Sequence, residues 1–143
     1  FQKSCLFQMT FPAPLPVSST PPPELLKGFS IAPAKVLRSI DYFLVYETQE
    51  EVENTVADFN YLNQVETLGF IITAKGNKAD FVSRFFVPNS VIGEDPVTGS
   101  AHATLIPYWA TELKKDSLTA IQLSKRKGNL WCGFQGERLT IAW

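Results

Sequence analysis

The stretch that decides the fold is AHATLIPYWATEL, residues 101–113. Its apolar residues stand at positions 101, 103, 105, 106, 108, 109, 110 and 113, which cover nearly the whole circumference of a helix. A helix that is apolar on all sides is buried in a core rather than laid on a surface. Pro107 removes one backbone hydrogen bond and should bend the helix. We therefore expect a central buried helix wrapped by strands. Its polar N-terminal end should be the one end that is exposed to solvent.

Strand-like segments stand on both sides of this helix. Before it we expect strands in CLFQMTFPA (residues 5–13), in KVLRSIDYFLVYET (35–48, chiefly Tyr42–Tyr46), in TLGFIITAKG (67–76) and in DFVSRFFVP (80–88). After it, TAIQLSKRKGNLWCGFQGERLTIAW (119–143) indicates three short strands joined by turns at 127–129 and 135–136. Aromatic and β-branched residues dominate these runs, and turn residues bound them.

The rest of the chain predicts a connector and two further helices. Six of the ten prolines fall between Pro12 and Pro23, which indicates an extended connector. PPPELLKGF (21–29) predicts a short helix that stops at Gly28. QEEVENTVADFNYLNQV (49–65) has apolar residues at 52, 56 and 59 among acids, which predicts one surface helix. The order of elements favours an α+β domain, with a mixed or antiparallel sheet around the central helix.

The composition excludes several classes of function. The chain has 143 residues, enough for one domain, and a formal net charge of −1. We expect no nucleic-acid partner, because there is no basic stripe, and no membrane partner, because no apolar run is long enough to cross a bilayer. Two cysteines without CxxC spacing and a single histidine make a poor metal site. We expect Cys5 and Cys132 to be reduced apolar fillers, which favours the cytoplasm.

The N-terminus, FQKSCLFQMT, carries no initiator methionine and lacks the order of a signal peptide. It starts within a strand-like run. We expect residues 1–143 to be one domain of a longer polypeptide.

The junction before the central helix, GEDPVTGSAH (93–102), holds the candidate site. Pro96 favours extended geometry at Asp95, and Gly99 leaves the backbone open to a ligand. A helix start leaves up to four amides unpaired and carries about half a positive charge, so it attracts a carboxylate or phosphate. With Asp95 and Glu94 beside it as acceptors or proton carriers, the junction suits an amino acid or a related small carboxylate.

The same residues also have a purely structural interpretation. Asp, Thr, Gly and Ser before an apolar helix are what helix capping alone would select. GxGxxG and GxxxxGK[ST] are absent, so nothing supports a nucleotide phosphate loop. GxSxG is absent too, and a serine nucleophile has no obvious base except His102.

SRFFVPNSVIGEDPVTGSAHATLIPYW (83–109) resembles the signature of the PhzF-like family, the relatives of the phenazine-biosynthesis isomerase. LFQMTFPAPLP (6–16) is similar to the segment that opens the second half of these proteins. LSKRKGNLWCGFQGERLTI (123–141) resembles their late R-x-G-x-L hairpin region. The likeness covers nearly the whole chain.

The resemblance implies a diaminopimelate epimerase-like fold of two halves, each a sheet around one central helix, with the active site in the cleft between them. It implies a cofactor-independent isomerase or epimerase, commonly a homodimer, that moves a proton on a small carboxylate-bearing or amino-acid-like substrate. Residues 1–143 would be the second, C-terminal domain, with the first domain of the same protein as partner. Asp95 matches the acid that holds the substrate and assists proton transfer. Gly99 and Ser100 match the backbone and hydroxyl donors that bind it.

One departure bears on activity. The family's principal acid/base is a glutamate in the first half, where a GHAT-type histidine also contributes. SAHAT (100–104) resembles the GHAT element, but the preceding EDP assigns it to the second half. By itself the chain is therefore not expected to turn over substrate, whereas the full-length protein is expected to be an isomerase. The substrate would be selected by residues from both halves.

Three side chains near the junction keep two interpretations each. Glu94 either binds substrate and tunes Asp95, because neighbouring carboxylates raise one another's pKa, or is a structural acid. His102 is either a substrate-binding general base or a packed core histidine. Arg84 either pairs with a backbone carbonyl or an acid, or steers substrate.

Two rival hypotheses remain for the whole chain. A fold does not confer activity, so the same architecture would serve a non-catalytic binding or protein-interaction module. A freestanding small domain without a ligand is the other alternative.

Overall fold

The computed structural model describes residues 6–9, 15–88, 93–95, 99–123, 128–135 and 138–142. The strands are β1 (Leu6–Met9), β2 (Val17–Ser18), β3 (Lys35–Arg38), β4 (Tyr42–Val45), β5 (Phe70–Lys75), β6 (Phe81–Phe86), β7 (Glu94–Asp95), β8 (Ser117–Gln122), β9 (Gly128–Gln135) and β10 (Arg138–Ala142). The helices are α1 (Pro23–Lys27), α2 (Gln49–Asn54), α3 (Phe59–Leu62) and α4 (Gly99–Leu113).

Within the described ranges all ten strands belong to one sheet. Nine of them follow the order β1-β10-β9-β8-β6-β5-β4-β3-β2, and β7 lies off this path and pairs with β6. The pairs β4–β5 and β6–β8 are parallel and the remaining pairs are antiparallel, so the sheet is mixed, as predicted. β5 pairs with β6 along one side. β8 pairs with residues 81–83 of β6, and β7 pairs with residues 85–86. Helix α4 is the connection from β7 back to β8.

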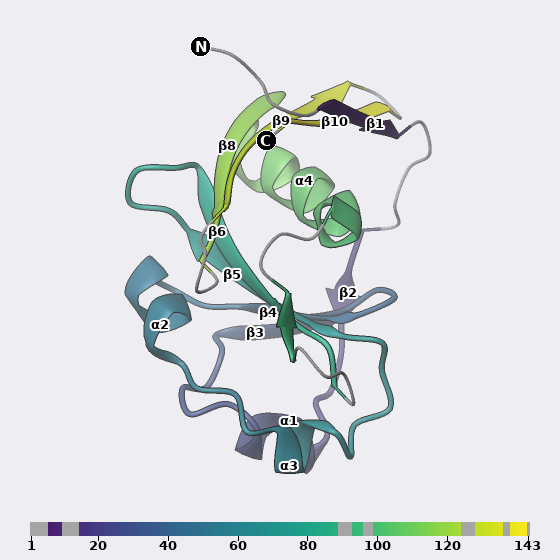
Figure 1. Ribbon diagram of the computed structural model, residues 1–143, viewed down its shortest axis with the longest axis vertical. Helices are drawn as coiled ribbons and strands as arrows, with labels where there is room; N and C mark the ends of the chain where they lie inside the picture. The colour runs from purple at the N-terminus through teal and green to yellow at the C-terminus, as the bar shows by residue number, and fades with distance from the viewer. Residues whose placement is uncertain are drawn as a thin grey trace.

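The sheet curves around α4 (Figure 1). β8, β9 and β10 arch over one side of the helix, and β4, β5 and β6 run beneath it. All ten residues from 101 to 110 are buried. The prediction of a buried central helix inside an α+β sheet is therefore confirmed.

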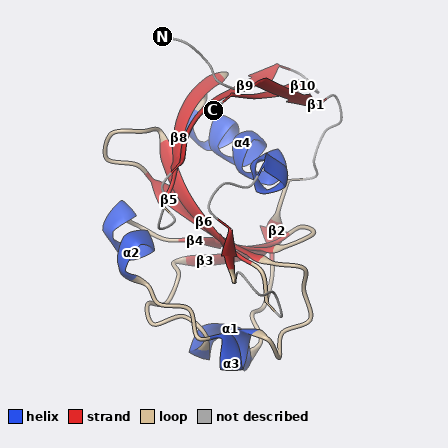
Figure 2. Cartoon of the chain, in the orientation of Figure 1, coloured by secondary structure: helices blue, strands red, loops and turns tan. Residues whose placement is uncertain are grey.

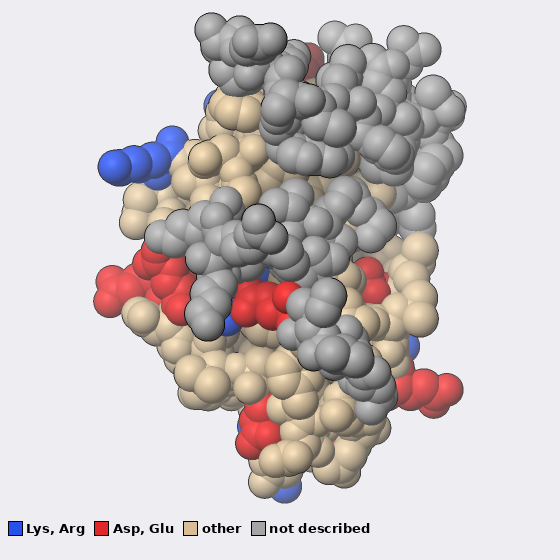
Figure 3. Space-filling model, in the orientation of Figure 1, with Lys and Arg blue, Asp and Glu red and all other residues tan. Residues whose placement is uncertain are grey.

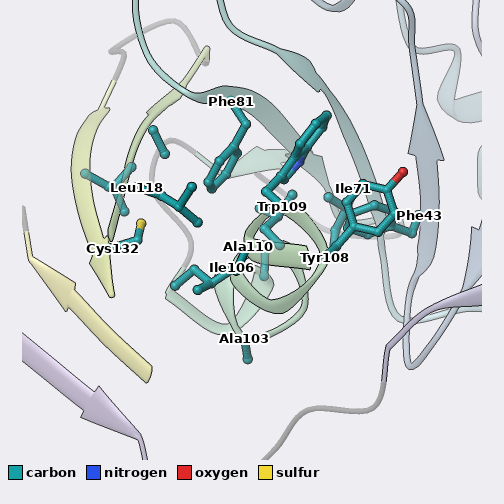
Figure 4. Close-up of a cluster of buried hydrophobic side chains, with 14 of the residues drawn as sticks. Phe43, Ile71, Phe81, Ala103, Ile106, Tyr108, Trp109, Ala110, Leu118 and Cys132 are labelled. Atoms are coloured by element: carbon teal, nitrogen blue, oxygen red, sulfur yellow. The ribbon is translucent and has the colours of Figure 1, made fainter. Parts of the chain in front are cut away.

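Aromatic side chains fill the space between α4 and the sheet. The ring of Trp109 stacks on Phe81 with the centroids 5.9 Å apart, and Tyr108 meets Phe43 at 4.9 Å (Figure 4). The indole N–H of Trp109 donates to Thr73 Oγ1 at 2.9 Å. The helix is thus held by stacking and by a buried hydrogen bond as well as by its apolar surface.

Three short helices cover the opposite face of the sheet (Figure 2). Leu25 of α1, Val52 of α2 and Leu62 of α3 are fully buried against side chains of β4, β5 and β6. Gly28 ends α1, as predicted, and a Cβ at this position would collide with Leu62, so the absent side chain lets α1 and α3 pack closely.

The predicted single helix over residues 49–65 is wrong, because the chain forms two helices there. Thr55 ends α2 in an extended conformation and is buried, with its Oγ1 accepting from the Ile31 amide at 3.1 Å. Ala57 then forms a bridge with Phe29. Val56, expected on the buried face of one helix, is 64% exposed.

Residues 35–48 contain a hairpin rather than one strand. β3 and β4 pair antiparallel, and the turn between them is closed by the Ser39 amide, which donates to the Asp41 carbonyl at 3.0 Å. The expected strand at Tyr42–Tyr46 corresponds to β4, and β3 is additional. The three strands expected after α4 are β8, β9 and β10.

Candidate functional site

The candidate site begins at β7, a strand of only two residues. Glu94 pairs with Phe86 and Asp95 with Phe85 of β6. Gly93 precedes them with a φ of 78°, a left-handed conformation that glycine adopts without strain. Its carbonyl accepts from the Val87 amide at 2.7 Å. The Val87–Gly93 hydrogen bond and the pairing with β6 fix where the chain approaches α4.

Helix α4 begins at Gly99, four residues after β7 ends. The first turn of a helix presents amides without intrahelical partners and the positive end of the helix dipole. Residues 96–98 and the side chains of Asp95, Gly99 and Ser100 lie outside the described part of the structure. The roles predicted for Asp95, Gly99 and Ser100 therefore stay predictions.

The carboxylate of Glu94 is held by Arg84. Nε and Nη2 of Arg84 donate to the two carboxylate oxygens, each at 3.0 Å. Nη1 of the same guanidinium donates to the carbonyls of Val52 at 3.0 Å and Thr55 at 2.8 Å. The interpretation of Arg84 as a partner for a backbone carbonyl or an acid is confirmed, because it binds both.

His102 is enclosed in the core. Its side chain is 0% exposed, and its ring centroid lies 6.0 Å from that of Phe81. This burial favours the packed core histidine, since a base that acts on a bound substrate must reach it. The substrate-binding role of His102 remains a prediction.

Away from the junction, burial raises the pKa values of several groups, among them Cys132 and Tyr46. Burial, with a smaller contribution from the charge of Asp80, raises the pKa of the Cys132 thiol to about 12. Cys132 is a free, buried cysteine, which agrees with its predicted role as an apolar filler. Burial raises the pKa of Tyr46 to about 12 as well, and its hydroxyl donates to the Ile31 carbonyl at 2.7 Å. Both groups are therefore protonated at neutral pH.

Acidic atoms are visible at the place of β7 on the face shown in Figure 3. The described residues contain no group of three or more His, Cys, Asp or Glu side chains arranged to hold a metal ion. None of the helices in the described ranges has the length and apolarity required to span a membrane.

A mixed sheet curves around the buried helix α4, and the two-residue strand Glu94–Asp95 precedes that helix. These features can be compared with those of known protein families. The sequence model of the phenazine biosynthesis-like protein family matches residues 26–138. This chain belongs to that family.

Curated relatives and solved structures agree with this assignment. Two uncharacterized isomerases of Pseudomonas aeruginosa are 48% and 43% identical, each over 94% of this chain and 52% of its own length. A crystal structure of a PhzF family protein from Enterococcus faecalis matches 99% of this chain and 55% of its own with a TM-score of 0.89 and 37% identity. A putative PhzC/PhzF protein from Clostridium difficile has a TM-score of 0.85 and 38% identity, over 96% of this chain and 53% of its own. The chain thus spans about half the length of these relatives.

The solved structures show that the chain has a PhzF-like fold. Sequence reasoning missed the pairing of β6 with β7, and it expected an acid as a partner of Arg84 without identifying Glu94 as that acid. The available signal was an arginine in the strand SRFF and an acid ten residues later, but only the fold places the two side by side.

Proposed function

We propose that this chain supplies the second half of a cofactor-independent isomerase or epimerase, which moves a proton on a small carboxylate-bearing substrate between two domains. The observation that carries this proposal is the start of α4, a helix buried over residues 101–110, four residues after the two acids of β7. The names of the similar isomerases support the reaction class. The partner half is the first domain of the same polypeptide. The two domains adopt a diaminopimelate epimerase-like arrangement, and the complete protein forms a homodimer.

In this mechanism the substrate carboxylate binds the free amides at Gly99 and Ser100, and the Ser100 hydroxyl adds a donor. Removing a proton from the carbon beside a carboxylate shifts negative charge onto the carboxylate oxygens. Amides fixed at a helix start stabilise that developing charge. Asp95 holds the substrate's polar group and carries a proton. The base across the cleft comes from the first domain.

The test is proton exchange on the complete natural polypeptide. The protein is incubated in D2O with a panel of small amino, hydroxy and dicarboxylic acids, and loss of the α-proton signal is followed by NMR. We expect exchange with at least one acid, and we expect Asp95→Ala to abolish it while the melting temperature is nearly unchanged.

Asp58→Ala is the matched control, because Asp58 is a helix cap whose Oδ1 accepts from the Asn60 amide at 3.0 Å. This variant should lose stability, by about 1 kcal/mol, and keep the exchange activity. If Asp95→Ala instead behaves like Asp58→Ala, Asp95 is a structural cap. If the complete wild-type protein exchanges no acid in the panel, the non-catalytic binding module becomes the better account.

A further inference from the structure

We propose that Arg84 is a positioning residue for the reaction, which acts through Glu94 to fix Asp95 at the start of α4. This inference rests on the proposed function. It assigns Glu94 a positioning role and removes it from the residues that contact substrate.

The first step is the geometry of the guanidinium. Arg84 makes four hydrogen bonds, two to the carboxylate of Glu94 and two to the carbonyls of Val52 and Thr55. Val52 belongs to α2, and Thr55 is its C-cap. The guanidinium carbon also lies 4.8 Å from the centre of the Phe86 ring. One side chain therefore ties β7 to the end of α2.

The second step is the weakness of β7 by itself. The strand has two residues and pairs with β6 at two positions. A ladder this short holds few backbone hydrogen bonds, whereas a bidentate pair between Arg and a carboxylate adds two charge-assisted ones. The pair is largely shielded, with side-chain exposures of 14% for Arg84 and 23% for Glu94, so solvent screens it less than a surface pair. The ion pair is thus a main constraint on β7.

The third step is the register of positions 94 and 95 against β6. Glu94 stands opposite Phe86, which belongs to the core beneath α1, α2 and α3. Asp95 stands opposite Phe85, which belongs to the core around α4. Neighbouring positions of a strand belong to opposite faces. Position 94 therefore belongs to the face that α1, α2 and α3 cover, where Arg84 binds Glu94. Position 95 belongs to the face that carries α4.

The consequence is a division of roles. Each carboxylate oxygen of Glu94 accepts a hydrogen bond from Arg84, so the guanidinium fixes the orientation of this carboxylate. A lysine at position 84 keeps the charge but has no planar fork to bind the carboxylate and two carbonyls together. Arg84→Lys should therefore release β7 without changing the net charge.

The experiment uses the complete natural polypeptide with Arg84→Lys, Glu94→Gln and the double variant. Arg38→Lys is the matched control, because Arg38 also donates to a side-chain oxygen (Tyr42 Oη, 2.9 Å) and a backbone carbonyl (Glu66, 3.0 Å) and lies over an aromatic ring, but on β3. Amide hydrogen exchange is measured by mass spectrometry on peptides covering residues 93–103 and α1. The kcat and KM are measured with whichever acid of the panel shows the fastest proton exchange.

Arg84→Lys and Glu94→Gln should each speed amide exchange in residues 93–103 by about tenfold and leave α1 unchanged. Both should lower kcat by roughly 10- to 100-fold, because displacement of a reacting group by about 1 Å is that costly, with KM within about twofold. The double variant should be no worse than either single one, and Arg38→Lys should resemble wild type.

Unchanged amide exchange in both variants would overturn the proposal. So would a Glu94→Gln variant with a raised KM beside an Arg84→Lys variant with an unchanged one, because Glu94 would then contact substrate directly. Glu94→Gln decides the matter if Arg84→Lys does not fold, since it leaves both carbonyl bonds of Arg84 in place. If wild type exchanges no acid while both variants loosen residues 93–103, the proposed function fails and the anchoring of β7 by Arg84 stands.

Discussion

The two faces of the sheet are filled in different ways. One long helix, α4, fills one face and is buried over ten consecutive residues. Three short helices cover the other face and leave large apolar side chains exposed, including Leu26 at 45%, Val56 at 64% and Tyr61 at 38%. On the α4 face we therefore expect most of the packing energy to come from α4 itself. The candidate site lies at the start of the same helix. The other face holds the site in place through Arg84.

The largest effect is expected on the α4 face. Trp109→Ala removes a ring that is 6% exposed, its stacking on Phe81 and its hydrogen bond to Thr73. We expect a loss of about 3–5 kcal/mol in the free energy of unfolding, measured by urea denaturation. Trp131→Ala is the control, because Trp131 is 36% exposed, and it should cost about 1 kcal/mol or less. Equal losses would mean that α4 is not the main source of stability.

A smaller effect is expected on the opposite face. Gly28→Ala places a Cβ against the side chain of Leu62, which is fully buried on α3. Overpacking of this kind costs about 1–3 kcal/mol, because the neighbours must shift. Urea denaturation under the same conditions measures it. If Gly28→Ala lowered the free energy of unfolding as much as Trp109→Ala does, the two faces of the sheet would contribute equally to stability, contrary to this account.

The smallest effect is expected at Asp80, which lies just before β6 and accepts from Lys115, after α4, and from Thr119 of β8. Burial by itself would raise the pKa of Asp80, but bonds from Lys115 Nζ at 2.7 Å and the Thr119 amide at 2.8 Å outweigh it and lower the pKa below 3.8. A carboxylate with a lowered pKa stabilises the fold above the pKa of the unfolded chain. That contribution is lost as the pH falls through the folded pKa.

Wild type should therefore exceed Asp80→Asn in stability at pH 7 by less than about 1 kcal/mol, because the pair with Lys115 is partly exposed. The difference should shrink as the pH falls below about 4. Thermal melts from pH 7 to pH 3 measure it. A difference that grows towards low pH would show that the sign is wrong and that Asp80 is not stabilised as a carboxylate.

The sequence predicted the elements whose pattern is local. The apolar residues of 101–113 identified α4, Gly28 marked the end of α1, and aromatic and β-branched runs located β4, β5 and β6. The break between α2 and α3 escaped prediction, because it depends on Thr55 and Ala57 meeting Ile31 and Phe29 from far along the chain. Local periodicity holds no information on such contacts.

The candidate site divides in the same way. The anion-binding character proposed for GEDPVTGSAH is inferred from neighbouring residues and a helix start, so it could be proposed from the sequence alone. The function of Glu94 does not follow from its neighbours, because its partner Arg84 lies on another strand and reaches it only after β6 and β7 have paired. Long-range pairing explains why the anchoring role was found only in the structure.

The most direct test of the account is an NMR titration of the chain with succinate, a small dicarboxylate probe. Amide nitrogen and proton shifts are followed at Gly99, Ser100 and Ala101 at the start of α4, and at Leu118 on β8 as the reference. The account predicts saturable shifts at the three helix-start amides, weakened by Asp95→Ala, with Leu118 unmoved. Shifts that are absent or spread evenly over the chain at millimolar succinate would contradict it.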